Sequence, residues 1–155
     1  MQFDILTLFP DQVRAMLDAS ILQRAQTAGL ITIKTHDLRP FGLGPHQTVD
    51  DTPYGGGKGM VLKPDVVVPA IKKIAQTGAK PRIILLTPQG ERFSQAKAEQ
   101  LAQEERLLLV AGHYEGFDER IRAYVDEELS LGDFVLTGGE LAAAVVVDAV
   151  ARLVP

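Results

Sequence analysis

The sequence predicts a single α/β domain in which helices flank a largely parallel sheet. Short apolar segments typical of buried strands alternate along the chain with segments whose apolar residues recur at helical spacing. A length of 155 residues suits one domain, and an apolar content of 46% is enough to bury a core.

Two strands and one helix are predicted in the first third of the chain. Phe3–Leu8 and Ile31–Lys34 are apolar and β-prone, so both are expected to be buried strands. Pro10 suits the first turn of a helix, and Gly29 ends that helix. The apolar residues of this helix recur at a spacing that places them on one face: Val13, Met16, Leu17 and Ile21.

Residues 39–60 differ from the segments around them. They hold three prolines and six glycines and show no sustained periodicity, so they are predicted to form a long loop. Loops of this length within a compact domain are usually functional or disordered.

Two further strands are predicted after this loop. Arg82–Leu86 is apolar and ends at Thr87-Pro88-Gln89-Gly90, which is a turn sequence. Leu107–Val110 is another apolar strand of the same kind and ends at Ala111-Gly112. A later apolar segment, Leu129–Leu136, is interrupted by a glycine.

Four helices are predicted around these strands. The first begins at Pro64 and runs to about residue 76, and the second is capped by Ser94 and reaches about residue 104. A short helix covers Phe117–Tyr124. The last, Glu140–Leu153, is apolar on nearly all sides, which predicts burial within the fold or between subunits.

The composition excludes several kinds of site. The chain has no cysteine, which rules out disulfides, thiolate metal sites and cysteine nucleophiles. The three histidines lie far apart and form no metal-ligand pattern. No apolar run is long enough to span a bilayer, and the first residues lack the regions of a signal peptide, so a cytoplasmic protein without membrane contact is expected.

The net charge of −4 is not that of a typical nucleic-acid-binding protein. The charge is uneven, however: residues 1–80 carry nine lysines and arginines against seven acids, and residues 81–155 carry seven against thirteen. Binding to RNA would therefore need a local basic patch or a contribution from outside this chain.

Three glycine-bearing segments each follow an apolar strand: Thr87–Gly90, Gly112–Gly116 and Ser130–Gly139. Each alone could be an ordinary turn. Ligands of open α/β sheets bind at the carboxyl ends of the strands, so three such segments together favour a shared ligand site. Glycines there let backbone groups approach a flat ligand such as adenine closely.

The known phosphate-binding motifs do not fit. Gly55–Met60 superficially resembles a P-loop, but no serine or threonine follows Lys58 and no glycine stands five residues before it. Gly42–Gln47 fails the dinucleotide fingerprint at its last glycine and does not follow a strand. A cofactor held through adenine and backbone, without phosphates, fits better.

Three groups of charged residues are open to more than one interpretation. Gly112–Arg120 is the densest polar cluster and could be a solvated helix start, yet it places a Tyr-Glu pair between two glycines at a strand end. Asp50 and Asp51 are either solvated loop acids or part of a site. Arg152 is the only basic residue of the last helix and could cap that helix or stabilise an anion.

Together these segments resemble the bacterial tRNA (guanine-37-N1)-methyltransferases of the SPOUT class, over essentially the whole chain. The order and spacing of the matching motifs are highly specific, although each motif alone is modest. They are Leu8–Pro10, Thr48–Gly57, Gly59-Met60, Thr87–Gly90, Gly112–Arg120, Ser130–Leu141 and Asp148–Arg152.

The resemblance implies a SPOUT-type fold with a C-terminal trefoil knot, an obligate homodimer with the active site at the subunit interface, and methyl transfer from S-adenosylmethionine to N1 of guanosine-37 in tRNA. It implies that the three glycine-bearing loops hold the cofactor, with adenine bound mainly by backbone groups. The cofactor-binding residues are expected to be Leu86, Thr87, Pro88, Gln89, Gly112, Tyr114, Glu115, Gly116, Ser130, Leu131, Gly132, Phe134, Leu136, Gly138 and Gly139.

The reaction requires removal of the N1 proton and stabilisation of charge on O6 of guanine. The resemblance assigns the stabilising cation to Arg152, which would reach the site across the dimer. Glu115 is expected to contact the cofactor or the guanine, and Asp50 is a secondary candidate on the long loop. The family reaction also uses Mg²⁺, for which the sequence shows no ligand set.

The resemblance places the general base in a linker just beyond Pro155 and a tRNA-gripping helical domain after it. We therefore expect residues 1–155 to be a cofactor-binding domain with impaired turnover. Two alternatives are a related SPOUT enzyme that methylates ribose or ribosomal RNA, and a non-catalytic dimeric module that binds an adenosine ligand.

Overall fold

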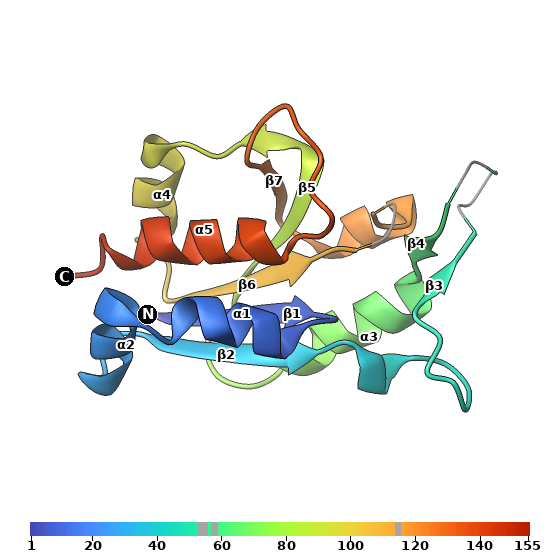
Figure 1. Ribbon diagram of the computed structural model, residues 1–155, viewed down its shortest axis with the longest axis horizontal. Helices are drawn as coiled ribbons and strands as arrows, with labels where there is room; N and C mark the ends of the chain where they lie inside the picture. The colour runs from blue at the N-terminus through green and yellow to red at the C-terminus, as the bar shows by residue number, and fades with distance from the viewer. Residues whose placement is uncertain (53–55, 57–58, 114–115) are drawn as a thin grey trace.

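The computed structural model describes residues 1–52, 56, 59–113 and 116–155. A five-stranded sheet with the order β2-β1-β6-β5-β7 forms its centre, and every neighbouring pair of strands is parallel (Figure 1). This confirms the predicted fold class. The strands are β1 (Gln2–Thr7), β2 (Thr32–Asp37), β5 (Arg82–Arg92), β6 (Arg106–Ala111) and β7 (Glu127–Ser130).

Helices cover both faces of the sheet because successive strand residues point to opposite sides. Phe3, Ile5 and Leu107 belong to a core shared with the helices of one face. Those helices are α1 (Pro10–Leu17), α2 (Ser20–Thr27), α4 (Gln95–Leu101) and α5 (Glu140–Ala151). Leu6 and Leu108 face the opposite core, which contains α3 (Pro64–Ala75) and the 3₁₀ helix η2 (Glu119–Tyr124).

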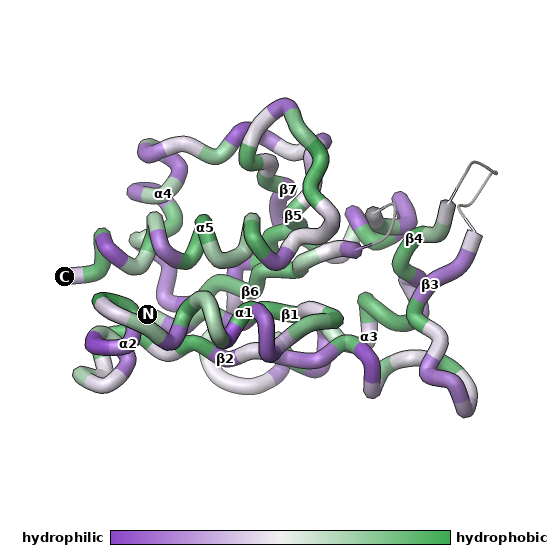
Figure 2. The backbone as a smooth tube through the Cα atoms, viewed as in Figure 1, coloured by the Kyte–Doolittle hydropathy of each residue, from purple (hydrophilic) through white to green (hydrophobic). Residues whose placement is uncertain are grey.

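Figure 2 shows the resulting pattern, with hydrophobic residues along the central strands and α5. Among the described residues, no helix is long and apolar enough to cross a membrane. The trefoil knot implied by the resemblance stays a prediction.

The first predicted helix is wrong in its extent. Helix α1 ends at Leu17, and α2 begins at Ser20, whose positive φ of 54° turns the chain between them. Ile21 consequently leaves the buried stripe and is 67% exposed.

The long loop over residues 39–60 contains more regular structure than its composition predicts. A 3₁₀ turn, η1 (Arg39–Phe41), follows β2, and β3 (Asp50–Asp51) pairs antiparallel with β4 (Val61–Leu62). Leu62 also forms a bridge with Phe117, which ties this small hairpin to the segment after β6.

Within one chain, only one side of the apolar helix α5 is buried. Ala143, Val146 and Val150 are fully buried, whereas Leu141 and Val145 are 47% and 46% exposed. An apolar stripe of α5 therefore faces away from its own core.

Candidate functional site

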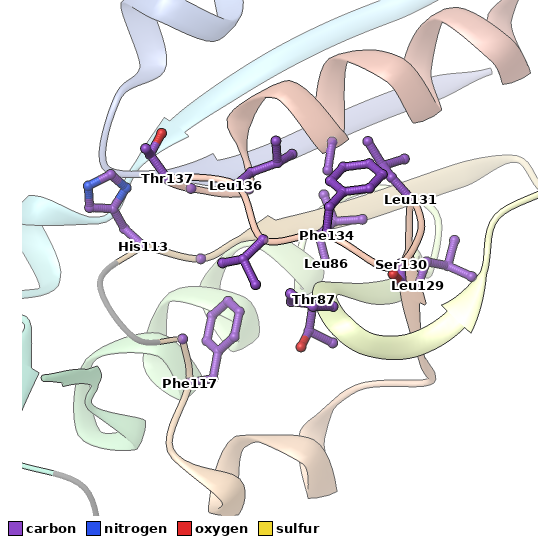
Figure 3. Close-up of a pocket in the computed structure, with 17 residues that line it drawn as sticks. Leu86, Thr87, His113, Phe117, Leu129, Ser130, Leu131, Phe134, Leu136 and Thr137 are labelled. Atoms are coloured by element: carbon purple, nitrogen blue, oxygen red, sulfur yellow. The ribbon is translucent and has the colours of Figure 1, made fainter. Parts of the chain in front are cut away.

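A cavity of about 140 Å³ lies at the carboxyl edge of the sheet, where the three glycine-bearing segments meet (Figure 3). Its walls come from the middle of β5, from the segment after β6, from the end of β7, from the loop over residues 131–139 and from the start of α5. The segments predicted to share a ligand site therefore do lie together. The lining residues are Leu86, Thr87, Pro88, Gly112, His113, Gly116, Phe117, Leu129, Ser130, Leu131, Phe134, Val135, Leu136, Thr137, Gly138, Gly139 and Ala142.

A bulge in β5 forms one wall. Leu86 and Glu91 both pair with Leu129 of β7, so the four residues between them leave the ladder. The predicted turn at Thr87–Gly90 is thus part of a strand that continues to Arg92. Gly90 packs so closely on β7 that a Cβ there would lie 2.5 Å from the carbonyl carbon of Glu128. The bulge brings Thr87 and Pro88 to the cavity.

A close backbone crossing forms another wall. Gly139 donates a hydrogen bond of 2.7 Å to the carbonyl oxygen of Gly112, and His113 bridges to Gly138. A Cβ at Gly139 would lie 2.8 Å from the Cα of Ala111 and from the nitrogen of Gly112. Glycine is required here because backbone meets backbone, and the crossing fixes the loop over residues 131–139 against β6.

The same loop begins with a local turn. The hydroxyl of Ser130 accepts from the N–H of Gly132 at 3.1 Å and donates to its carbonyl oxygen at 3.0 Å. Phe134 lies against Gly132, where a Cβ would come within 2.9 Å of the phenyl ring, and the ring is 53% exposed. In Figure 3, Phe134 extends over the cavity between Leu131 and Leu136.

All but two of the predicted cofactor-binding residues that the structure describes line this cavity. Gln89 is exposed, and its side-chain oxygen accepts from Arg122. Gly132 is buried beneath Phe134 and does not line the cavity. Tyr114 and Glu115 lie outside the described residues.

The other two candidate catalytic residues stand away from the cavity. Asp50 is half-buried in β3 and pairs with Leu62. Its connection to the cavity is indirect, because Leu62 forms a bridge with Phe117, which lines the cavity. Arg152 is exposed at the C-terminal end of α5. At about 1.5 Å per residue, the helix places it roughly 15 Å beyond Ala142, the last residue of α5 that lines the cavity. Within one chain, Arg152 and the cavity are therefore separate.

Several lining residues were not named as site residues from the sequence. His113 and Phe117 belong to the polar cluster Gly112–Arg120, so this motif could have identified them as site residues. The other four are Leu129, Val135, Thr137 and Ala142, which resemble ordinary core or loop residues.

Asp118, in the same motif, has a structural role. Its carboxylate caps η2 and pairs with Arg120, with 2.7 Å between Oδ2 and Nη2. The hydrogen bond from Arg120 holds the pKa of Asp118 below its usual value, although burial opposes the shift. A carboxylate with a lowered pKa is a weaker proton acceptor, which disfavours Asp118 as a general base.

Comparison with known proteins gives a consistent result. The model of the family "tRNA (Guanine-1)-methyltransferase TrmD" matches residues 1–155. The chain is 57% identical to a tRNA (guanine-N(1)-)-methyltransferase of Bacillus velezensis and 58% identical to one of Chloroflexus aggregans. All of this chain is covered in both matches, but only 65% and 62% of the two relatives.

A solved structure is similar throughout the chain. The crystal structure of tRNA (m1G37) methyltransferase from Aquifex aeolicus matches with a TM-score of 0.91 and 40% sequence identity, covering 100% of this chain and 70% of the other. The parallel sheet and the loops at its carboxyl edge are thus embedded in a fold that is shared over the full length of the chain.

Proposed function

Because the chain belongs to the tRNA (guanine-1)-methyltransferase family, we propose that it forms the part of such an enzyme that binds S-adenosylmethionine and transfers its methyl group to N1 of guanosine-37 in tRNA. The observation that carries the proposal is the convergence of three glycine-bearing loops on one cavity at the carboxyl edge of the sheet.

The cavity suits an adenosine cofactor without phosphates. Its described lining combines apolar side chains with backbone groups and contains no lysine or arginine for a phosphate. The glycines at 112, 138 and 139 line the cavity and leave no room for a Cβ against their protein neighbours, so at these positions the wall of the cavity is backbone. We assign adenine binding to the backbone of residues 87–90 and 130–136.

S-adenosylmethionine supplies an electrophilic methyl group on a sulfonium ion. Methyl transfer then requires that guanine N1 is aligned with this methyl group, that a general base accepts the N1 proton and that charge on O6 is stabilised. We assign the stabilising cation to Arg152 of a second copy, because within one chain this residue is far from the cavity. The exposed apolar stripe of α5, with Leu141 and Val145, supports an interface between copies.

The described lining contains no carboxylate, and His113 is its only titratable side chain. We assign Glu115 a contact with the cofactor or the guanine, and Asp50 of β3 stays a secondary candidate. We propose that the general base lies outside residues 1–155, so that these residues alone turn over slowly. We also propose that turnover uses Mg²⁺. Among the described residues, no group of three or more candidate metal ligands lies together.

Two measurements test the proposal. Calorimetric titration with S-adenosylhomocysteine should show binding, and no binding at millimolar ligand would contradict it. Incubation with S-adenosylmethionine and a tRNA transcript, followed by digestion to nucleosides and mass spectrometry, should yield 1-methylguanosine. A ribose-methylated nucleoside would favour the related SPOUT activity instead, and cofactor binding with no methylated product from any tRNA would favour a non-catalytic module.

A further inference from the structure

Most of the arginines are neutralised by carboxylates within the described part of the chain. Arg14, Arg82, Arg92, Arg106, Arg120 and Arg122 each form an ion pair with an aspartate or glutamate. Only three arginines form no such pair there: Arg24, Arg39 and Arg152. Arg152 already has a proposed role. The other two, Arg24 and Arg39, are both exposed.

Two ring contacts connect Arg39 to a residue that lines the cavity. Its guanidinium lies 5.5 Å from the centroid of the Phe9 ring, and the Phe9 ring lies 5.0 Å from the ring of His113. His113 lines the cavity, at the end opposite Ser130 in Figure 3. Phe9, Arg39 and His113 each follow the end of a different strand. Their contacts connect the cavity wall to the exposed guanidinium of Arg39.

The contacts of Arg39 fix the position of its guanidinium group but do not neutralise its charge. Nε donates to the carbonyl oxygen of Leu8 at 3.3 Å, and the backbone N–H donates to Asp37 at 2.9 Å. Within the described residues, the two terminal nitrogens of Arg39 have no hydrogen-bond partner. A planar guanidinium held at Nε and against a ring, with four N–H groups on its terminal nitrogens, can donate two parallel hydrogen bonds to the oxygens of an anion such as phosphate.

A second exposed cation lies beside it. Lys73 of α3 is 5.6 Å from the centroid of the Phe41 ring, and Phe41 is in the same 3₁₀ turn as Arg39. Neither cation forms an ion pair in the described part of the chain. In a chain of net charge −4, Arg39 and Lys73 form a local basic surface around η1.

We propose that Arg39, assisted by Lys73, binds the phosphate backbone of the substrate RNA beside the nucleotide that enters the cavity. This inference rests on the proposed function, because it takes the ligand of the cavity's outer margin to be RNA. Arg39 is a positioning residue: it holds the RNA at the site and takes no part in methyl transfer.

The test is binding of a fluorescein-labelled anticodon stem-loop RNA, followed by anisotropy over a series of salt concentrations with S-adenosylhomocysteine present. Arg39→Ala should weaken binding about tenfold at low salt. It should also reduce the slope of log K against log salt by about 0.7, which is the loss of one phosphate contact. Arg39→Lys should keep the slope and lose only part of the affinity, because the charge remains and the planar fork does not.

Arg24→Ala is the matched control, since Arg24 is an exposed arginine of α2 that forms no ion pair within the described part of the chain and lies far from η1 (Figure 1). It should leave both affinity and slope unchanged. The inference is overturned if Arg39→Ala behaves like Arg24→Ala, if it loses affinity for S-adenosylhomocysteine, or if the wild-type chain binds no RNA. Formation of 1-methylguanosine by the same preparation tests the proposed function separately, so the two failures are distinguishable.

Discussion

The hydroxyl of Thr7 donates a hydrogen bond of 2.9 Å to Oε1 of Glu140, which lies 133 residues later in the chain. Both side chains are buried, with exposed fractions of 0% and 3%. Glu140 is the first residue of α5, and its other oxygen lies 2.3 Å from where a Cβ of Gly138 would be. The bond therefore joins the end of β1 to the loop that closes the cavity.

Thr7→Val should lower the free energy of unfolding by about 1–3 kcal/mol, because a buried carboxylate oxygen loses its donor. The N–H of Phe9, which donates to the same hydroxyl at 2.9 Å, would lose its acceptor as well. Urea unfolding measures the change. Thr7→Ser should retain most of the stability, and Thr32→Val, at an exposed strand position, serves as the control. Equal losses for the two valine variants would contradict this role.

Gly139→Ala should reduce affinity for S-adenosylhomocysteine by about tenfold or more. The backbone of Gly139 has φ −84°, which alanine adopts readily, so the effect comes from the collision of Cβ with Ala111 and Gly112. Calorimetric titration gives the dissociation constant. Gly44→Ala is the control: φ there is +75° with open space around it, so stability should fall by about 1–2 kcal/mol with no change in cofactor affinity. The prediction fails if Gly139→Ala binds as tightly as Gly44→Ala.

Val145→Glu should convert a homodimer into a monomer of 16.8 kDa. The physical reason is that a charge placed on the exposed apolar stripe of α5 would have to be buried in the proposed interface. Sedimentation equilibrium reads out the mass. Ile21→Glu introduces the same charge at an isolated exposed residue of α2 and should leave the dimer intact. A wild-type chain that is monomeric at all concentrations would contradict the interface itself.

Asp4 should contribute to stability in a pH-dependent way. Burial tends to raise the pKa of Asp4, but hydrogen bonds from His36 and Arg106 outweigh burial and lower it. The distances are 2.7 Å from Oδ1 to Nε2 of His36 and 2.8 Å from Oδ2 to Nε of Arg106. Because the folded-state pKa lies below the unfolded value, the stabilisation is complete above about pH 4 and is lost as the pH falls through the folded pKa.

Asp4→Asn should accordingly cost about 3–5 kcal/mol at neutral pH, because it leaves the buried Arg106 without its counter-ion. The difference from wild type should shrink below about pH 4. Chemical unfolding at several pH values measures both effects. Asp11→Asn, at an exposed position of α1, should show neither. A loss that stays constant down to acid pH would exclude the ionised carboxylate as its source.

Sequence patterns predicted the parallel sheet because its strands are buried on both faces and appear as continuous apolar runs. They also predicted the position of the cavity, since turns after such strands meet at one edge of the sheet. The break between α1 and α2 was missed because Asp18-Ala19-Ser20 contains neither glycine nor proline. The pair of Asp4 and Arg106 was missed because hydrogen bonding across 102 residues leaves no local pattern.

The bulge in β5 shows a further limit. Thr87–Gly90 has the composition of a turn, and a turn was predicted, yet the strand resumes at Glu91 because Leu129 can pair on both sides of the bulge. Arg152 illustrates the reverse case: the resemblance marks it as catalytic, whereas one chain alone places it at the far end of α5. Its assignment depends on a second copy, which no pattern within one sequence can place.

Residues 1–155 should bind the cofactor and still transfer its methyl group slowly. Loss of a positioned general base typically costs about 10²–10⁴-fold in rate. The described cavity lining has no carboxylate, and Asp118 is held by Arg120. A single-turnover assay with tRNA carrying guanosine at position 37 measures the transfer step without product release.

The comparator is the Bacillus velezensis relative, of which this chain covers 65%. At saturating cofactor and RNA, the single-turnover rate of the relative should be at least about 10²-fold higher than that of this chain. Glu115→Gln then separates the remaining possibilities, because Glu115 is the one motif carboxylate outside the described residues. A rate for the wild-type chain equal to that of the relative, abolished by Glu115→Gln, would place the proton acceptor within residues 1–155 and refute the prediction.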